Sequence, residues 1–133
     1  MSIESFDLGD VNKTLRVDWV CLGRGVWMLM AWHEQWPVPV GTVTFLPSGA
    51  NEVTNKKKAE ILDSNIMPKC RRQGVRTWLQ KQLFEHWSPD VVISQGSNDQ
   101  SAKWMEKVGY VIDDTLGCWV VTKENFEKAT SGV

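Results

Sequence analysis

The chain has 133 residues with a formal net charge of −1, and 42% of its residues are hydrophobic and 23% charged. These values exclude a disordered chain, a membrane-embedded chain and a general nucleic-acid polycation, and they are enough for one ordinary core. We therefore predict a single domain over residues 1–133, in which any basic feature is local.

The N-terminal sequence and the cysteines bear on the cellular compartment. The first ten residues, "MSIESFDLGD", are acidic and contain no apolar run of the kind found in a secretory signal. No segment is long and apolar enough to span a bilayer, so we expect no membrane partner. The three cysteines are an odd number without paired spacing, which favours a reducing compartment. The predicted location is the cytoplasm.

Four strands are predicted in the first half of the chain. Residues 15–22 and 26–34 read as strands joined by a short glycine turn, as in a hairpin. "VGTVTFL" (40–46) has the alternation of a third strand, and "AEILDSNI" (59–66) is the fourth.

The pattern then changes from hairpins to a crossover. A helix is predicted over about 72–87, because apolar residues repeat every four positions at Val75, Leu79, Leu83 and Trp87. "VVIS" (91–94) is a short apolar run typical of a strand covered on both faces. A second helix over about 98–108, a last hairpin and a polar C-terminal tail over 124–133 complete the chain.

These elements predict an α/β (α+β) fold with a mixed, mostly antiparallel sheet. Strand, helix and strand over 59–94 form a central parallel unit with right-handed connection. The sheet is expected to be antiparallel at both ends, and few helices are expected in the N-terminal half.

The start of the predicted helix over 72–87 is unusually basic. Lys69, Arg71, Arg72 and Arg76 surround it, although a helix start carries partial positive charge and each cation there costs roughly 0.3–1 kcal/mol. Backbone amides converge where a strand runs into a helix, and Gly74 allows close approach to them. The pattern predicts an anion site, yet neither common nucleotide motif matches it.

On these residues the chain resembles the GNAT superfamily of N-acetyltransferases over about 59–122. Their pyrophosphate loop reads Arg/Gln-x-x-Gly-x-Gly/Ala between a strand and a helix, and Arg71-Arg72-Gln73-Gly74-Val75-Arg76 follows "IMPKC" in that place. A second landmark is an Asn that opens a helix ending in Gly-Phe, which Asn98 to Gly109-Tyr110 matches in spacing. Two motifs in the right order and on the expected elements are more specific than either alone.

The resemblance implies an acetyltransferase that binds acetyl-CoA and transfers its acetyl group directly to an amine of a protein or small molecule. Amides near the end of the fourth strand would hold the oxyanion, and amides of residues 72–77 would hold the pyrophosphate. The implied cofactor-binding residues are Asn65, Ile66, Met67, Arg71, Arg72, Gln73, Gly74, Val75, Arg76, Thr77 and Asn98.

The general base remains open between several groups. Glu60 and Asp63 are the carboxylates on the fourth strand, and their separation by three points them to opposite faces. "AEI" resembles the start of this strand in histone-acetylating relatives, so Glu60 is preferred over Asp63, while a solvated edge carboxylate is the alternative. His33 is a third candidate, and many relatives use a chain of waters.

Two departures from the family pattern bear on catalysis. Arg76 stands where Gly or Ala is usual, and Met105 stands where relatives commonly carry the Tyr that acts as general acid. A thioether donates no proton, and Tyr110 occupies a core aromatic position. A non-catalytic module that keeps the GNAT fold and binds acyl-CoA or a macromolecular partner is therefore the alternative function.

The acceptor side is expected to be open, because only a glycine turn joins the first two strands where relatives place helices. An open site suits a large acceptor or completion by a second subunit in a homodimer. We expect at least one of Trp27, Trp32 and Trp36 to be more than half exposed near this opening. No metal-ligand spacing is present among the three cysteines, His33 and His86, so no metal is expected.

Overall fold

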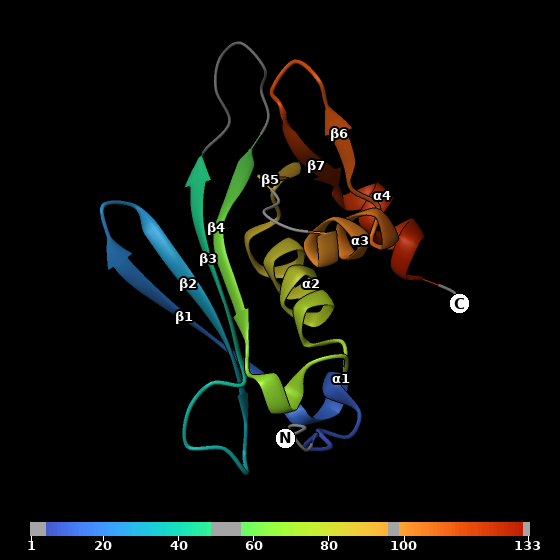
Figure 1. Cartoon of the computed structure of the whole chain (residues 1–133). Helices are drawn as coiled ribbons and strands as arrows, with labels where there is room; N and C mark the ends of the chain where they lie inside the picture. The colour runs from blue at the N-terminus through green and yellow to red at the C-terminus, as the bar shows by residue number, and fades with distance from the viewer. Residues whose placement is uncertain (1–4, 49–56, 96–98, 132–133) are drawn as a thin grey trace. The chain divides into compact units, whose positions relative to one another are not determined.

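The computed structural model describes residues 5–48, 57–95 and 99–131 (Figure 1). The strands are β1 (Leu15–Gly23), β2 (Val26–His33), β3 (Gly41–Ser48), β4 (Lys58–Ile66), β5 (Val91–Ser94), β6 (Val111–Asp113) and β7 (Cys118–Thr122). The helices are α1 (Val11–Thr14), the 3₁₀ turn η1 (Pro68–Cys70), α2 (Val75–Trp87), α3 (Asp99–Lys107) and α4 (Lys123–Thr130).

The strands form one sheet in the order β1-β2-β3-β4-β5-β7-β6. Strands β4 and β5 are parallel, while β1–β2, β2–β3, β5–β7 and β6–β7 are antiparallel pairs. The predicted mixed, mostly antiparallel sheet with a parallel strand–helix–strand unit is therefore confirmed. No helix in the described ranges is long and apolar enough to cross a membrane.

The chain divides into two compact units. The first unit contains α1, β1, β2, η1, α2, β3 up to Phe45 and β4 from Leu62. The second unit contains the other ends of β3 and β4 together with β5, α3, β6, β7 and α4. The single domain expected for residues 1–133 stays a prediction.

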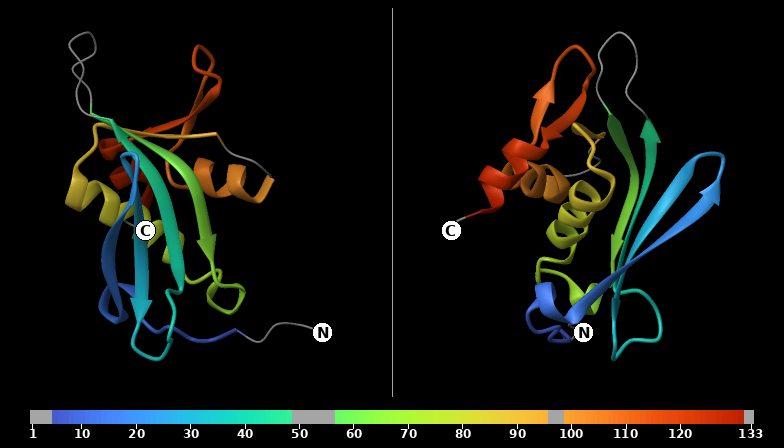
Figure 2. Two further views of the ribbon diagram at one scale, coloured as in Figure 1. Left: turned by 90° about the vertical axis from the view of Figure 1, so that its left-hand side faces the viewer. Right: turned by 180° about the vertical axis from the view of Figure 1, so that it is seen from behind.

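A tight hairpin and a packed helix organise the first unit. Gly23 pairs with Val26, which leaves Arg24 and Gly25 as a two-residue turn with φ of 55° and 78°. Positive φ at both central positions matches the right-handed twist of the flanking strands. Helix α2 packs against β2 (Figure 2).

Gly41 on β3 permits the close packing of α2 in the first unit. A Cβ atom at this position would lie 2.8 Å from Ile66 Cδ1 and 2.8 Å from Val75 Cγ1. The apolar stripe predicted for this helix is confirmed at Val75, Leu79 and Leu83, which are buried, while Trp87 at its end is partly buried.

In the second unit, α3 ends in a Schellman motif. The N–H of Tyr110 donates to Met105 O at 2.9 Å and the N–H of Gly109 donates to Glu106 O at 3.3 Å. Gly109 has a φ of 99°, the left-handed conformation that this motif requires. The predicted helix end before Gly109 is thus confirmed, while the predicted opening at Asn98 lies outside the described residues.

Two further segments differ from the sequence-based expectations. The polar tail expected over 124–133 contains α4, whose single buried apolar residue is Phe126. The helix expected from residue 72 begins at Val75, because Arg72 and Gly74 have φ of 63° and 84° and cannot belong to a right-handed helix.

Candidate functional site

The predicted pyrophosphate loop lies in the first unit, between β4 and α2. The chain leaves β4 at Ile66, passes through η1 and reaches α2 through Arg71-Arg72-Gln73-Gly74. Arg72 and Gly74 both adopt positive φ. A non-glycine residue held in this region costs of order 1–3 kcal/mol, so surrounding contacts must keep Arg72 there. Alternation of helical and left-handed residues forms concave groups of amides that bind anions.

The charges around this loop oppose the helix dipole. The first turn of α2 contains no acidic residue. Lys69, Arg71 and Arg72 are exposed and Arg76 is partly buried. The first N–H groups of a helix find no acceptor within the helix itself, so the dipole and these side chains all present positive charge. The arrangement suits a multiply charged anion such as a pyrophosphate.

Gly74 leaves room for such an anion. It is exposed, and a Cβ atom added to it would meet only Val11 Cγ2, at 4.0 Å. The backbone at this point is thus accessible, and the residues present fit a phosphate group.

The remaining predicted cofactor-binding residues differ in their surroundings. Asn65 is exposed and its Nδ2 donates to Asp63 Oδ2 at 2.9 Å. The N–H of Met67 donates to Val40 O at 2.9 Å, so this amide is engaged within the protein. Arg71 Nε donates to Ile66 O at 3.2 Å, which folds this side chain back over the end of β4. Ile66 and Thr77 are partly buried, Val75 is buried, and Asn98 lies outside the described residues.

Gln73 has contacts that the sequence did not indicate. Its Oε1 accepts from the N–H of Leu8 at 2.8 Å and its Nε2 donates to Phe6 O at 2.5 Å. The N–H of Phe6 also donates to Lys69 O at 2.8 Å. The N-terminal segment therefore lies against the loop. No local pattern signals contacts between residues 65 and 67 positions apart.

The two candidate carboxylates on β4 lie in different surroundings. Glu60, in the second unit, is opposite Ile93 of β5 and is partly buried. Asp63, in the first unit, is exposed and already accepts the hydrogen bond from Asn65. One oxygen of Asp63 is already engaged by the Asn65 amide, which leaves Glu60 as the better candidate for a general base. The surroundings therefore favour Glu60.

Cys118 lies close enough to Glu60 to respond to its charge. Burial raises the pKa of the Cys118 thiol, and the negative charges of Asp113 and Glu60 raise it further. Burial also raises the pKa of Cys70. Because the thiolate is the nucleophile, Cys70 and Cys118 are both poor nucleophiles.

The residue at the position of the family's acid, the core aromatic Tyr110 and the third candidate base, His33, are all buried. Met105 is fully buried and Tyr110 is 4% exposed. His33 is also buried, its Nδ1 accepts from the N–H of Gln35 at 3.2 Å, and its ring contacts Phe6 edge-on. These contacts give His33 a structural role.

The expectation of an exposed tryptophan near the β1–β2 opening is wrong. Trp27, Trp32 and Trp36 are each partly buried, and none is more than half exposed. The ring of Trp36 packs edge-on against Phe6 at 5.2 Å. This aromatic contact with Phe6 accounts for part of the burial of Trp36.

Several solved structures have a fold similar to that of this chain. A putative acetyltransferase from Exiguobacterium sp. 255-15 matches with a TM-score of 0.57 and 13% identity, covering 82% of this chain and 70% of that one. NAA60 of Arabidopsis thaliana, solved with a bisubstrate analogue, matches with a TM-score of 0.58 and 13% identity, covering 74% of each chain.

A third match is a chain of the NatC complex bound to Gag peptide and CoA, with a TM-score of 0.55 and 12% identity, covering 71% of this chain and 70% of that one. No protein-family profile and no curated protein matches the sequence. The similarity to these solved structures is therefore a similarity of fold.

Proposed function

We propose that this chain, which has the fold of the GNAT acetyltransferases, is an N-acetyltransferase that uses acetyl-CoA to acetylate an amine of a protein or small molecule. The observation that carries the proposal is the cationic loop before α2, with two left-handed residues and a helix start without an acidic residue. Structures with this fold include one bound to CoA and one bound to a bisubstrate analogue.

Each part of the loop has a role in this proposal. The amides near Gly74 and the start of α2 would bind the pyrophosphate, and Arg72 and Arg76 would add positive charge beside it. Asn65 and Ile66, at the end of β4, are the proposed positions of the amides that stabilise the oxyanion. Acetyl-CoA supplies the activated acyl group, a thioester.

Glu60 is the proposed general base. An alkyl ammonium with a pKa of about 10.4 must lose a proton before its nitrogen can attack a carbonyl carbon. In direct transfer the N–C bond forms, the C–S bond breaks, Glu60 accepts the amine proton and the thiol leaves with a proton from water. Asp63 is the less favoured base.

The alternative is a non-catalytic module that binds acyl-CoA or a macromolecular partner. The buried Met105 favours it, because this position carries the acid in the resembling family and a buried thioether donates no proton. A homodimer that completes the acceptor side stays a prediction. The three cysteines are free, which supports a reducing compartment such as the cytoplasm.

Release of free thiol from acetyl-CoA tests the proposal. Wild type, Glu60→Gln and Asp63→Asn are assayed with peptides bearing free N-termini, lysine peptides and polyamines. We expect wild type to release thiol with at least one amine, Glu60→Gln to lose roughly 10²-fold or more in kcat, and Asp63→Asn to stay near wild type. Binding of CoA without thiol release from any amine would favour the non-catalytic alternative.

A further inference from the structure

We propose that residues 5–14, here called the N-terminal strap, hold the pyrophosphate loop in its binding conformation, with Gln73 as the positioning residue. The inference rests on the proposed coenzyme site and assigns a control of that site to a segment distant in sequence. Figures 1 and 2 show the strap, in blue, beside η1 and the start of α2.

The strap is joined to the loop by three hydrogen bonds. Gln73 uses both ends of its side-chain amide, as acceptor for the N–H of Leu8 and as donor to Phe6 O. The N–H of Phe6 donates to Lys69 O, three residues before Arg72. Because the amide has a donor and an acceptor with different partners, its orientation is determined by this pairing. The side chain of Gln73 is therefore fixed to the strap.

The strap is itself anchored in the first unit. Leu8 is 1% exposed, and the ring of Phe6 contacts His33 and Trp36 edge-on at 5.8 and 5.2 Å. Asp10 then caps α1, where its Oδ1 accepts from the N–H of Asn12 at 3.0 Å, and α1 contacts α2. A segment with a buried leucine and a packed aromatic ring is a firm support for the loop.

The position of Gln73 links the strap to the part of the loop that is proposed to bind the pyrophosphate. Gln73 lies between Arg72 and Gly74, the two residues with positive φ. A left-handed arginine is unfavourable on its own, and the cations of the loop repel one another, so the conformation needs an external constraint. The strap supplies it. The amides that the proposed function assigns to the pyrophosphate are presented only while this conformation persists.

Coupling of this kind is reciprocal. If the strap favours the conformation that binds the coenzyme, the coenzyme must stabilise the strap by the same factor. CoA is therefore expected to slow hydrogen exchange of the Leu8 amide, although the strap bonds this amide to Gln73 rather than to the ligand.

The experiment measures the Kd of CoA and the exchange rate of the Leu8 amide with and without CoA. Gln73→Ala removes both side-chain bonds, and Phe6→Ala loosens the strap from outside the loop. Gln82→Ala, which removes the same amide from the middle of α2, is the matched control. All binding is measured below the unfolding transition of each variant.

We expect Gln73→Ala and Phe6→Ala to raise the Kd of CoA about tenfold, within the usual range of allosteric coupling, and Gln82→Ala to leave it unchanged. CoA should protect the Leu8 amide in wild type and no longer in Gln73→Ala. An unchanged Kd in Gln73→Ala, with a lower Tm alone, would make the strap merely structural and overturn this inference. Failure of wild type to bind CoA would instead overturn the proposed function, and the role of the strap in binding with it.

Discussion

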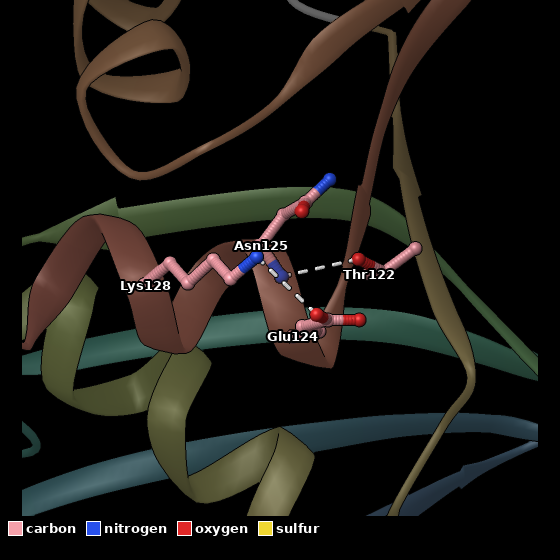
Figure 3. A network of polar contacts seen from close by, with 4 residues as sticks. All are labelled: Thr122, Glu124, Asn125 and Lys128. Carbon is pink, nitrogen blue, oxygen red and sulfur yellow. Dashed lines mark hydrogen bonds and ion pairs between the residues drawn. The ribbon is translucent and has the colours of Figure 1, made fainter.

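Helices α2 and α4 begin in opposite ways. At α4, Thr122 Oγ1 accepts from the N–H of Asn125 at 3.2 Å, Glu124 lies in the first turn, and Lys128 Nζ lies 3.3 Å from Glu124 Oε1 (Figure 3). At α2 the first turn has no acidic residue, and arginines precede it.

The difference indicates what each helix start needs. The start of α4 is capped and its charges complement the dipole, so it requires no ligand. The start of α2 has its positive dipole end surrounded by positive side chains in a left-handed loop. A bound anion would supply at α2 the negative charge and hydrogen-bond acceptors that Thr122 and Glu124 supply at α4.

The largest expected effect on stability comes from Gly109, which packs against the first turn of α4. A Cβ atom there would lie 2.7 Å from Asn125 O, and its φ is 99°. Gly109→Ala should lower the free energy of unfolding by about 3 kcal/mol, from the clash and the positive φ together. Thermal unfolding measures it.

Gly117→Ala is the matched control. Gly117 has a φ of 68° but no atom within 4 Å of an added Cβ, so only the conformational cost applies. It should cost about 1 kcal/mol. Equal losses in the two variants would show that α4 does not pack on Gly109 as described.

Removing the cap of α4 should have an intermediate effect. Thr122→Ala deletes the acceptor for the N–H of Asn125 and should cost about 1 kcal/mol, whereas Thr122→Ser should retain most of the stability. Tm is the measurement. The increase in Tm on adding CoA should be the same in both variants as in wild type. A different increase would contradict the claim that CoA acts at the start of α2 and not at that of α4.

Arg72→Gly should have the smallest effect on stability. Glycine relieves the strain at φ 63° but gains entropy in the unfolded chain, so the two effects, each about 1 kcal/mol, nearly cancel. Loss of the charge should nevertheless weaken CoA binding several-fold and reduce its dependence on salt.

Arg24→Gly is the control for this change, since Arg24 is also left-handed, with φ 55°, in the β1–β2 turn. It should leave the Kd of CoA unchanged. Equal CoA affinities in the two variants would show that Arg72 is a surface residue like Arg24.

Local patterns predicted most of the fold. The strand predicted over 59–66 matches β4 to within one residue, and the apolar repeat ending at Trp87 located the end of α2 correctly. The start of α2 was misplaced because left-handed φ at an arginine leaves no mark in the sequence. Helix α4 was missed because it buries one apolar residue, Phe126, although Thr122 and the Glu124–Lys128 spacing are cap and pair signals.

The candidate site was predictable only where the motif is local. Arg71 to Arg76 formed a recognisable loop, and the basic helix start indicated an anion. The partners of Gln73 lie more than 60 positions away in the sequence. Contacts of this range follow from the tertiary fold.

The central claim is that the start of α2 binds the pyrophosphate of acetyl-CoA. The most direct measurement is the free energy of unfolding with and without CoA, at low and high salt, for wild type, Gly74→Ala and Gly74→Glu. Both variants carry the same positive-φ cost, since Gly74 has φ 84°, but only glutamate adds a carboxylate where the phosphates would lie.

For wild type we predict a gain of about 2.7 kcal/mol at a CoA concentration of 100 times Kd, and at a fixed CoA concentration a smaller gain at high salt, because partly exposed charges are screened. Gly74→Ala should keep a measurable gain, and Gly74→Glu should show none while remaining folded. An equal gain in wild type and Gly74→Glu, or no gain in wild type, would contradict the claim.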